Sequence, residues 1–416
     1  MGSGEWGKDP FPIPHCLLFS EESATMKTAT QCVHFDSNDD PHCSISPPIY
    51  QTATFRQPTA DEFGEYDYTR SGNPTRSLVE RQIARLEGAE YACAFASGMA
   101  AITALTRLVG AGCEIIAGDD LYGGTVRLLD QILPRQGIGV RYVDVTDVDA
   151  VREALNPRVK LILIETPSNP TMRIADIRAL ARVAREAGAL LAVDNSMLSP
   201  CFQQPLKLGV DIVVHSATKF LCGHSDVTGG ALVVNDYDLN RQIAFQQNAE
   251  GAGLSPFDSW LLLRGMKTLS LRVERQNESA RKIAEFLSRH RAVDRVYYPG
   301  LADHPGHEIH RSQSKGDGAV ISFTTGDVDV SRQVVEATRL FDIAVSFGSV
   351  GSTISLPCRM SHASIPQALR ERLAPPPDLV RISVGIEDVD DLIEDLSQAF
   401  ALAARREDAI SAACAV

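Results

Sequence analysis

The sequence lacks an apolar run of bilayer length, an internal repeat and an excess of basic residues. Its strongest apolar runs, such as Leu161–Ile164, have the length of a single strand, so we expect no membrane-spanning segment. The formal net charge of −13 argues against a nucleic-acid or anionic-membrane partner, because both attract basic surfaces. We therefore expect a soluble protein whose partner is a small molecule.

No two of the nine cysteines form a Cys-x-x-Cys pair, and their number is odd. Such a pattern fits neither a zinc cluster nor a disulfide framework, so we expect no metal site and a reducing compartment. Residues 1–26 are rich in Pro, Gly and polar residues, and we predict a disordered leader there. This leader fits neither a signal peptide nor a transit peptide well, and Met26 is an alternative start. We expect a cytoplasmic location, or a plastid if a transit peptide precedes this sequence.

Short apolar runs alternate with amphipathic stretches from residue 79 onward. Strands are predicted at Tyr91–Phe95, Glu114–Ala117, Arg141–Val145, Val159–Ile164, Leu190–Val193, Asp211–His215 and Ala231–Val234. Repeated β-α-β units with strands apolar on both faces predict an α/β fold, in which helices flank a mostly parallel sheet. After about residue 250 we predict one long helix through Leu261–Leu287, then a smaller α+β domain. The expected divisions are 1–26, 27–78, 79–275 for the large domain and 276–416 for the C-terminal domain.

Chemically useful residues follow several of these strands, at the sheet edge where parallel sheets bind ligands. After Tyr91–Phe95, Ser97, Gly98 and Met99 open a helix whose free N–H groups suit a phosphate, although Gly and Ser also open helices as simple caps. Asp194 follows the strand Leu190–Val193. It either caps the next helix or keeps a pyridinium nitrogen protonated.

Lys219 follows the strand Asp211–His215 in the segment Ser216-Ala217-Thr218-Lys219, so two hydroxyl residues, Ser216 and Thr218, precede it closely. Burial after a strand would lower the pKa of this lysine and make it nucleophilic, as Schiff-base chemistry requires; the alternative is a surface charge. Asn169 lies in a proline-rich turn after another strand, and is either aimed at the same crevice or part of a plain turn. A phosphate turn, an aspartate and a lysine at successive strand ends together predict a pyridoxal 5′-phosphate site of fold-type I.

The sequence resembles the trans-sulfuration enzymes of cysteine and methionine metabolism, and within them the plant-type cystathionine β-lyases. The similarity runs from about residue 45 to 400. It is carried by the segments SPPIYQTATF, YDYTRSGNPTR, FASGMAA, AGDDLYGGT, ETPSNP, VDNS, HSATKFLCGHSDV, DHPGH, AVSFGSV, PCRMSHASIP and VRISVGIEDVDDLI.

The resemblance implies a role for each matching residue. Lys219 would hold the cofactor and shuttle protons, Asp194 would pair with the ring nitrogen, and Tyr122 would stack on the ring, unless it is a core aromatic. The phosphate would be bound by Gly98, Met99, Ser216 and Thr218, and by Tyr68 and Arg70 of a neighbouring subunit. Arg381, with Ser346 and Asn169, would bind the α-carboxylate of an amino-acid substrate, unless its guanidinium is merely solvated. The arm 27–78 would contact that neighbouring subunit in a homotetramer built from two dimers.

The position of Gly351 bears on the reaction. Members of the family that act at Cγ typically have a glutamate there, whereas this chain has glycine. The resemblance therefore implies β-elimination: L-cystathionine and water give L-homocysteine, pyruvate and ammonia, a step of methionine biosynthesis. Plant-type members usually have a basic residue at this position, so preference among cystathionine, cystine and other cysteine conjugates stays open. The alternatives are a cystathionine or methionine γ-lyase and an inactive family member that serves as a scaffold.

Overall fold

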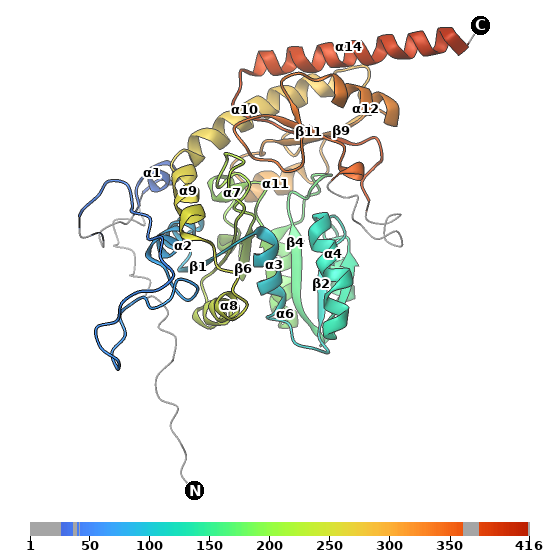
Figure 1. Cartoon of the computed structure of the whole chain (residues 1–416). Coiled ribbons are helices and arrows are strands. Elements are labelled where there is room, and N and C mark those ends of the chain that lie inside the picture. The colour runs from blue at the N-terminus through green and yellow to red at the C-terminus, as the bar shows by residue number, and fades with distance from the viewer. Residues whose placement is uncertain (1–25, 36–39, 41, 361–373, 415–416) are drawn as a thin grey trace.

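The computed structural model describes residues 26–35, 40, 42–360 and 374–414, with side chains up to residue 405. All but Met26 of the predicted leader therefore lies outside the described residues, as does part of the PCRMSHASIP segment. Two sheets organise the rest of the chain, one of seven strands and one of five (Figure 1).

The larger sheet has the strand order β1-β7-β6-β5-β4-β2-β3. Its strands are β1 (Tyr91–Phe95), β2 (Glu114–Gly118), β3 (Gly139–Val143), β4 (Val159–Glu165), β5 (Leu190–Asp194), β6 (Ile212–His215) and β7 (Gly230–Val234). The pairs from β3 through β2, β4 and β5 to β6 are parallel, while β7 is antiparallel to both of its neighbours. The prediction of a mostly parallel sheet is confirmed.

Helices cover both faces of this sheet because both faces are apolar. On β4, Leu161 and Leu163 belong to one hydrophobic cluster, and Ile162 and Ile164 belong to the other, as the alternation of side chains along a strand requires. The helices of this half of the chain are α2 (Pro74–Glu87), which precedes β1, α3 (Gly98–Thr106), α4 (Gly123–Gln131), α5 (Val148–Ala154), α6 (Ile177–Ala187) and α7 (Ser199–Phe202), which lie between strands, and α8 (Tyr237–Ala249), which follows β7.

The smaller sheet has the order β10-β11-β12-β9-β8 and lies at the other end of the molecule (Figure 1). Its strands are β8 (Arg295–Tyr297), β9 (Val320–Thr324), β10 (Asp342–Ile343), β11 (Thr353–Ser355) and β12 (Val380–Ser383). The helices α11 (His307–Gln313), α12 (Val328–Ala337) and α14 (Val389–Cys414) belong to this half of the chain. The central strand β12 is antiparallel to both β11 and β9 and carries Arg381. A second, smaller α+β unit is confirmed.

The prediction of one long helix through Leu261–Leu287 is wrong, because the segment forms α9 (Pro256–Met266) and α10 (Leu269–Ser288). Arg272 of α10 explains the break. Its Nη2 donates to the carbonyl of Gly265 at 2.9 Å and its Nε to Thr268 Oγ1 at 3.0 Å. Gly265 itself packs so closely on the backbone of Cys222 that a Cβ there would overlap the Cys222 carbonyl. At the break, the Gly265 carbonyl therefore accepts from a buried guanidinium as well as from the Thr268 N–H at 3.3 Å.

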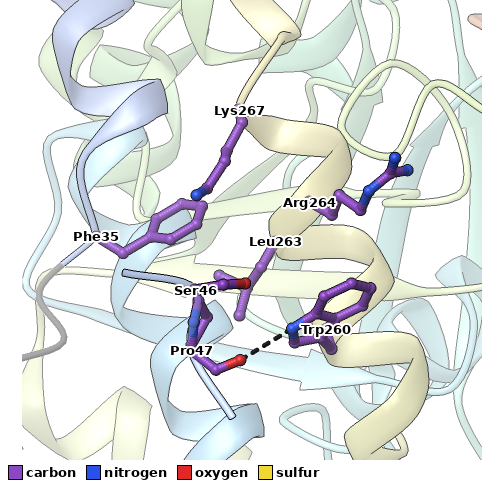
Figure 2. A pocket seen from close by; sticks show the side chains of 7 residues that line it. All are labelled: Phe35, Ser46, Pro47, Trp260, Leu263, Arg264 and Lys267. Carbon is purple, nitrogen blue, oxygen red and sulfur yellow. Dashed lines mark hydrogen bonds between the residues drawn. The ribbon is translucent and has the colours of Figure 1, made fainter. Parts of the chain in front are cut away.

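The N-terminal arm lies along α9, as Figure 2 shows. The indole Nε1 of Trp260 donates to the carbonyl oxygen of Pro47 at 2.9 Å, and the Lys267 ammonium lies 5.0 Å from the centroid of the Phe35 ring. The arm begins with α1 (Thr28–Val33), which packs on α2 and α10. No helix in the described part of the chain is both long and apolar enough to cross a membrane.

Candidate active site

The first turn of α3 meets the segment that follows β6. The side chain of Ser97 accepts a hydrogen bond from the Ala100 N–H at 3.0 Å and so caps the helix. A Cβ added to Gly98 would lie 3.0 Å from Cβ and Oγ of Ser216, so glycine allows this close approach. The N–H groups at Gly98 and Met99 and the hydroxyl of Ser216 thus lie together. This set of donors suits a phosphate.

Asp194 ends β5 beside β6, with which it pairs at Val214. Its Oδ1 accepts from the N–H of Ser196 at 3.0 Å, and Ser196 Oγ accepts in turn from the N–H of Ser216 at 2.6 Å. Burial raises the pKa of Asp194, and the hydrogen bonds from Ser196 and the charge of Lys219 oppose that shift. Ser196 therefore joins the two strand ends that carry the predicted aspartate and lysine.

Lys219 is half-buried and is held by the second half of the chain. Its Nζ donates to Ser346 Oγ at 2.6 Å and lies 4.7 Å from the centroid of the Phe347 ring. Burial, and then the nearby charge of Arg381, lower the pKa of Lys219 to about 8, although Asp194 acts in the opposite direction. A larger share of this amine is neutral at pH 7 than for a free lysine, which is the state a nucleophile needs.

Arg381 points into the same site from β12. Its Nη1 donates to Asn169 Oδ1 and its Nη2 to the carbonyl oxygen of Ser346, both at 2.8 Å. The residue is 2% exposed, so the alternative of a merely solvated guanidinium is wrong. Burial lowers the pKa of Arg381 to about 10, which still leaves it protonated at neutral pH. Because both partners are neutral oxygens, the positive charge is available to an anionic ligand.

Tyr122 lies at the start of α4 with 41% of its surface exposed, which excludes the alternative of a core aromatic. Its N–H donates to Glu165 Oε2 at 3.3 Å. Burial first, and then Asp194 and Asp120, raise the pKa of Glu165 well above its usual value. Sequence reasoning missed Glu165; the only signal is a carboxyl residue at the end of an otherwise apolar strand.

Sequence reasoning also missed a pair of buried side chains, His215 at the end of β6 and Glu87 at the end of α2. His215 Nε2 is 2.6 Å from Glu87 Oε1, and both side chains are buried. The amide of Asn195 donates to the same carboxylate oxygen at 2.9 Å. Since His215 precedes Ser216 and Asn195 follows Asp194, this network fixes the ends of β5 and β6 relative to each other.

Three predicted residues have other contacts. The Thr218 hydroxyl donates to the Gly229 carbonyl at 3.2 Å and accepts from the Gly229 N–H at 2.9 Å, so it would have to rotate in order to donate to a phosphate. Arg70 donates through Nε to Asn248 Oδ1 at 3.2 Å and lies 5.3 Å from the centroid of the Tyr68 ring. Within the described chain, neither Tyr68 nor Arg70 is hydrogen-bonded to the residues around Lys219.

The residues present fit pyridoxal 5′-phosphate. Lys219 offers an amine of lowered pKa, Asp194 a carboxyl group for the ring nitrogen, and Ser216 with the start of α3 a set of donors for the phosphate. The part of the chain that the structure describes contains no cluster of three or more His, Cys, Asp and Glu side chains arranged to hold a metal.

Comparison with known proteins agrees with this geometry. A family model described as "Cys/Met metabolism PLP-dependent enzyme" matches residues 29–401. The chain is 56% identical over 372 residues to a chloroplastic cystathionine β-lyase of Arabidopsis thaliana, which covers 89% of this chain and 80% of the relative. It is 48% identical over 375 residues to a cystathionine γ-lyase of Bacillus subtilis, and that match covers 90% of this chain and 99% of the relative.

A solved structure is also similar over almost its whole length. The cystathionine γ-lyase of Lactobacillus plantarum, determined in complex with L-serine, superposes with a TM-score of 0.88 at 44% identity. The match covers 91% of this chain and 99% of that one. Both sheets of the present structure therefore belong to one shared fold.

Proposed function

The chain belongs to the family of Cys/Met metabolism PLP-dependent enzymes, and we propose that it is a carbon–sulfur β-lyase that converts L-cystathionine and water to L-homocysteine, pyruvate and ammonia. The observation that carries the proposal is the contact between Lys219 Nζ and Ser346 Oγ. Through it, the half-buried amine of Lys219 lies beside Ser346, the residue whose carbonyl oxygen accepts from Arg381. Lys219 as a base and Arg381 as a binding group for a carboxylate are thereby close enough to act on one amino-acid substrate. Release of homocysteine assigns the reaction to methionine biosynthesis.

Pyridoxal phosphate supplies an electron sink that makes the α-proton of an amino acid acidic. We assign the removal of that proton to Lys219 Nζ, since its pKa of about 8 lets a substantial fraction be neutral at physiological pH. Ser346 Oγ orients the amine by accepting its hydrogen bond. The carboxyl of Asp194 is assigned to the ring nitrogen and the exposed ring of Tyr122 to stacking beside the substrate.

The substrate carboxylate is assigned to Arg381, supported by Asn169 and Ser346. A planar guanidinium binds a carboxylate through two parallel hydrogen bonds, and the neutral partners of Arg381 hold its plane without neutralising it. The phosphate is assigned to the backbone N–H groups of Gly98 and Met99 at the start of α3 and to the hydroxyl groups of Ser216 and Thr218.

The choice of β- over γ-elimination depends on Gly351, where a Cβ would meet no atom within 4 Å. Cystathionine is expected to yield pyruvate and homocysteine, because this open position holds no carboxylate. Chromatography of the oxo-acid products against pyruvate and 2-oxobutyrate standards is the measurement. Gly351→Glu, which the open space can accommodate, should raise the 2-oxobutyrate fraction, with Gly351→Gln as the uncharged control.

A γ-lyase is the second candidate, favoured by the 48% identity to the enzyme named so in Bacillus subtilis. A predominance of 2-oxobutyrate and cysteine from the unmodified protein would select it and would leave the assignment of the cofactor intact. The inactive scaffold predicts a colourless protein without turnover. The buried, polar surroundings of Lys219 and Arg381 argue against it.

We further propose a homotetramer of two dimers, in which Tyr68 and Arg70 bind the phosphate of the neighbouring subunit. Both residues are exposed on the N-terminal arm, away from the Lys219 site of their own chain. Light scattering of the purified protein tests the mass of the assembly. The cytoplasmic location is likewise a proposal, with the plastid as its alternative, and a fluorescent fusion distinguishes the two.

Mixing of two inactive variants is expected to restore activity. Lys219→Ala and Arg70→Ala each damage one component of a shared site, so a mixed dimer has one site with both lesions and one with neither. Co-expression should therefore recover roughly a quarter of the wild-type activity, if half of the dimers are mixed and half of their sites are intact. Mixed dimers that are demonstrated by differential tagging yet show no recovery would assign Arg70 to its own subunit.

A further inference from the structure

A buried guanidinium at the start of α2 holds the loop that carries Tyr68 and Arg70. Arg76 lies in the first turn of α2 and is 2% exposed. Its Nη1 donates to the carbonyl oxygen of Thr69 at 2.7 Å, and its Nη2 donates to the carbonyl oxygen of Arg70 at 3.1 Å. These two carbonyl groups lie on either side of the Arg70 Cα, so one planar guanidinium fixes the backbone before and after that residue. None of the roles assigned above involves Arg76.

The guanidinium of Arg76 is itself held in place by two neighbours. Its Nε lies 3.7 Å from Glu80 Oε1, one turn further along α2. That oxygen also accepts from the N–H of Ala94 at 2.8 Å and from Nε2 of Gln247 at 3.0 Å, so the Glu80 side chain is fixed as well. The backbone of Gly253 packs against the guanidinium, since a Cβ added there would lie only 2.9 Å from Arg76 Nη1. The Nη groups of Arg76 therefore have little freedom to leave the two carbonyl oxygens.

The side chains of Tyr68 and Arg70 lie on the outside of this anchored loop. Both are exposed, whereas Thr69 between them is half-buried and donates its N–H to the carbonyl oxygen of Ala53 at 2.9 Å. The Arg70 guanidinium lies 5.3 Å from the centroid of the Tyr68 ring, and no carboxylate of the described chain forms an ion pair with it. An exposed cation and an exposed phenol are thus held close together on a backbone that is fixed from inside its own subunit. This pair suits an anion that another subunit supplies.

We propose that Arg76 is a positioning residue for phosphate binding across the subunit interface: it holds the loop in the shape that presents Tyr68 and Arg70 to the cofactor phosphate of the neighbouring subunit. The inference rests on the proposed function, in which these two side chains bind that phosphate. Arg76 does not contact the phosphate itself, because it is buried and both of its Nη groups donate to backbone oxygens. A loop that is held in its binding conformation loses less conformational entropy when the ligand binds, so the ligand is bound more tightly.

Arg76→Met is expected to raise the Kd for pyridoxal 5′-phosphate by about 10-fold or more, the effect of losing one charge-assisted hydrogen bond. The holoenzyme is dialysed against graded free concentrations of pyridoxal 5′-phosphate, or of pyridoxal, which lacks the phosphate, and visible absorption gives the occupancy. The Kd for pyridoxal should stay at the wild-type value. An equal loss of affinity for both ligands would overturn the proposal, because a merely structural role does not depend on the phosphate.

Three further variants sharpen this measurement. Arg76→Lys keeps the charge beside Glu80 but lacks the planar pair of donors, so its affinity for pyridoxal 5′-phosphate should be intermediate. Arg85→Met is the matched control, since Arg85 is a second buried arginine of α2 whose Nη2 donates to the carbonyl oxygen of Gln31, in another part of the arm, at 3.3 Å. It should keep both affinities. If Arg76→Met does not fold, Gly253→Ala replaces it, because the added Cβ displaces the guanidinium of an intact Arg76 and should weaken the binding of pyridoxal 5′-phosphate alone.

Mixed dimers test whether Arg76 acts on the neighbouring subunit. They are assayed at a cofactor concentration that leaves the Arg76→Met homo-oligomer largely empty. Co-expression with Lys219→Ala should recover roughly a quarter of the wild-type activity, because the site that keeps Lys219 receives an intact loop from its neighbour. Co-expression with Arg70→Ala should recover none, because both lesions then lie in the donated loop and every site receives a damaged one.

The pair Lys219→Ala and Arg70→Ala separates this proposal from the one on which it rests. If that pair recovers activity while Lys219→Ala with Arg76→Met does not, only the role of Arg76 is wrong. If neither pair recovers, despite demonstrated mixed dimers, the sharing of the site between subunits is wrong and Arg76 has no such role. Recovery in the pair Arg70→Ala and Arg76→Met would also overturn the proposal, since Arg76 would then act on something other than the donated loop.

Discussion

Lys219→Ala is expected to lower kcat/KM for cystathionine by at least about 10³-fold, because a positioned acid–base group contributes roughly 10²–10⁴ in rate and we also assign cofactor binding to this lysine. Burial lowers the pKa of Lys219 to about 8, so the lost group is an amine with a larger neutral fraction at neutral pH than an ordinary lysine. Its hydrogen-bond acceptor, Ser346 Oγ, loses a donor at the same time.

Steady-state assay of pyruvate release measures this effect, with the visible absorption of the bound cofactor as a second reading. Lys267→Ala is the control, because Lys267 lies at the end of α9 and its ammonium lies over the ring of Phe35 in the N-terminal arm, outside the site. The control should keep its colour and its turnover. If Lys219→Ala retained more than about a tenth of the wild-type kcat/KM, another group would have to remove the α-proton.

Arg381→Ala is expected to lower kcat/KM by roughly 10-fold to 100-fold or more, mainly through a higher KM. A charge-assisted contact contributes about 1.5–3 kcal/mol, and the bidentate arrangement adds to it. The residue is buried, so its removal also leaves Asn169 Oδ1 and the Ser346 carbonyl without their donor. Arg381→Lys keeps the charge but lacks the planar pair of donors, and should be intermediate.

The absorption of the bound cofactor should survive in both Arg381 variants, since Arg381 is assigned to the substrate alone. Thermal unfolding separates a loss of fold from a loss of substrate binding. An Arg381→Ala protein that is folded but has lost its cofactor would show that the assignment of this residue is wrong. A folded variant with an unchanged KM would do the same.

The large sheet was predictable because its central strands, such as β4 and β6, are buried on both faces. Runs such as Leu161–Ile164 are continuous in apolar residues, and the alternation of their side chains between two clusters makes the pattern a strand. The meeting of the site residues was likewise predictable from the sequence, because parallel strands bring the residues that follow them to the same edge of the sheet. Asp194 and Lys219 are thus joined through Ser196 and Ser216 in the structure.

Contacts made by single side chains across the fold were not predictable. The break before α10 depends on Arg272 donating to Gly265, which helical periodicity does not encode. Glu165 was missed because its raised pKa comes from burial beside two other carboxyl groups.

The central claim is that Lys219 binds pyridoxal phosphate at the edge of the large sheet. Borohydride reduction of the purified holoenzyme, followed by peptide mapping, tests it most directly, because reduction makes the link between the lysine and the cofactor permanent. We expect the pyridoxyl group on Lys219, in the peptide that contains Ser216-Ala217-Thr218-Lys219. A pyridoxyl group on any other lysine, or on none, would show that Lys219 does not bind the cofactor.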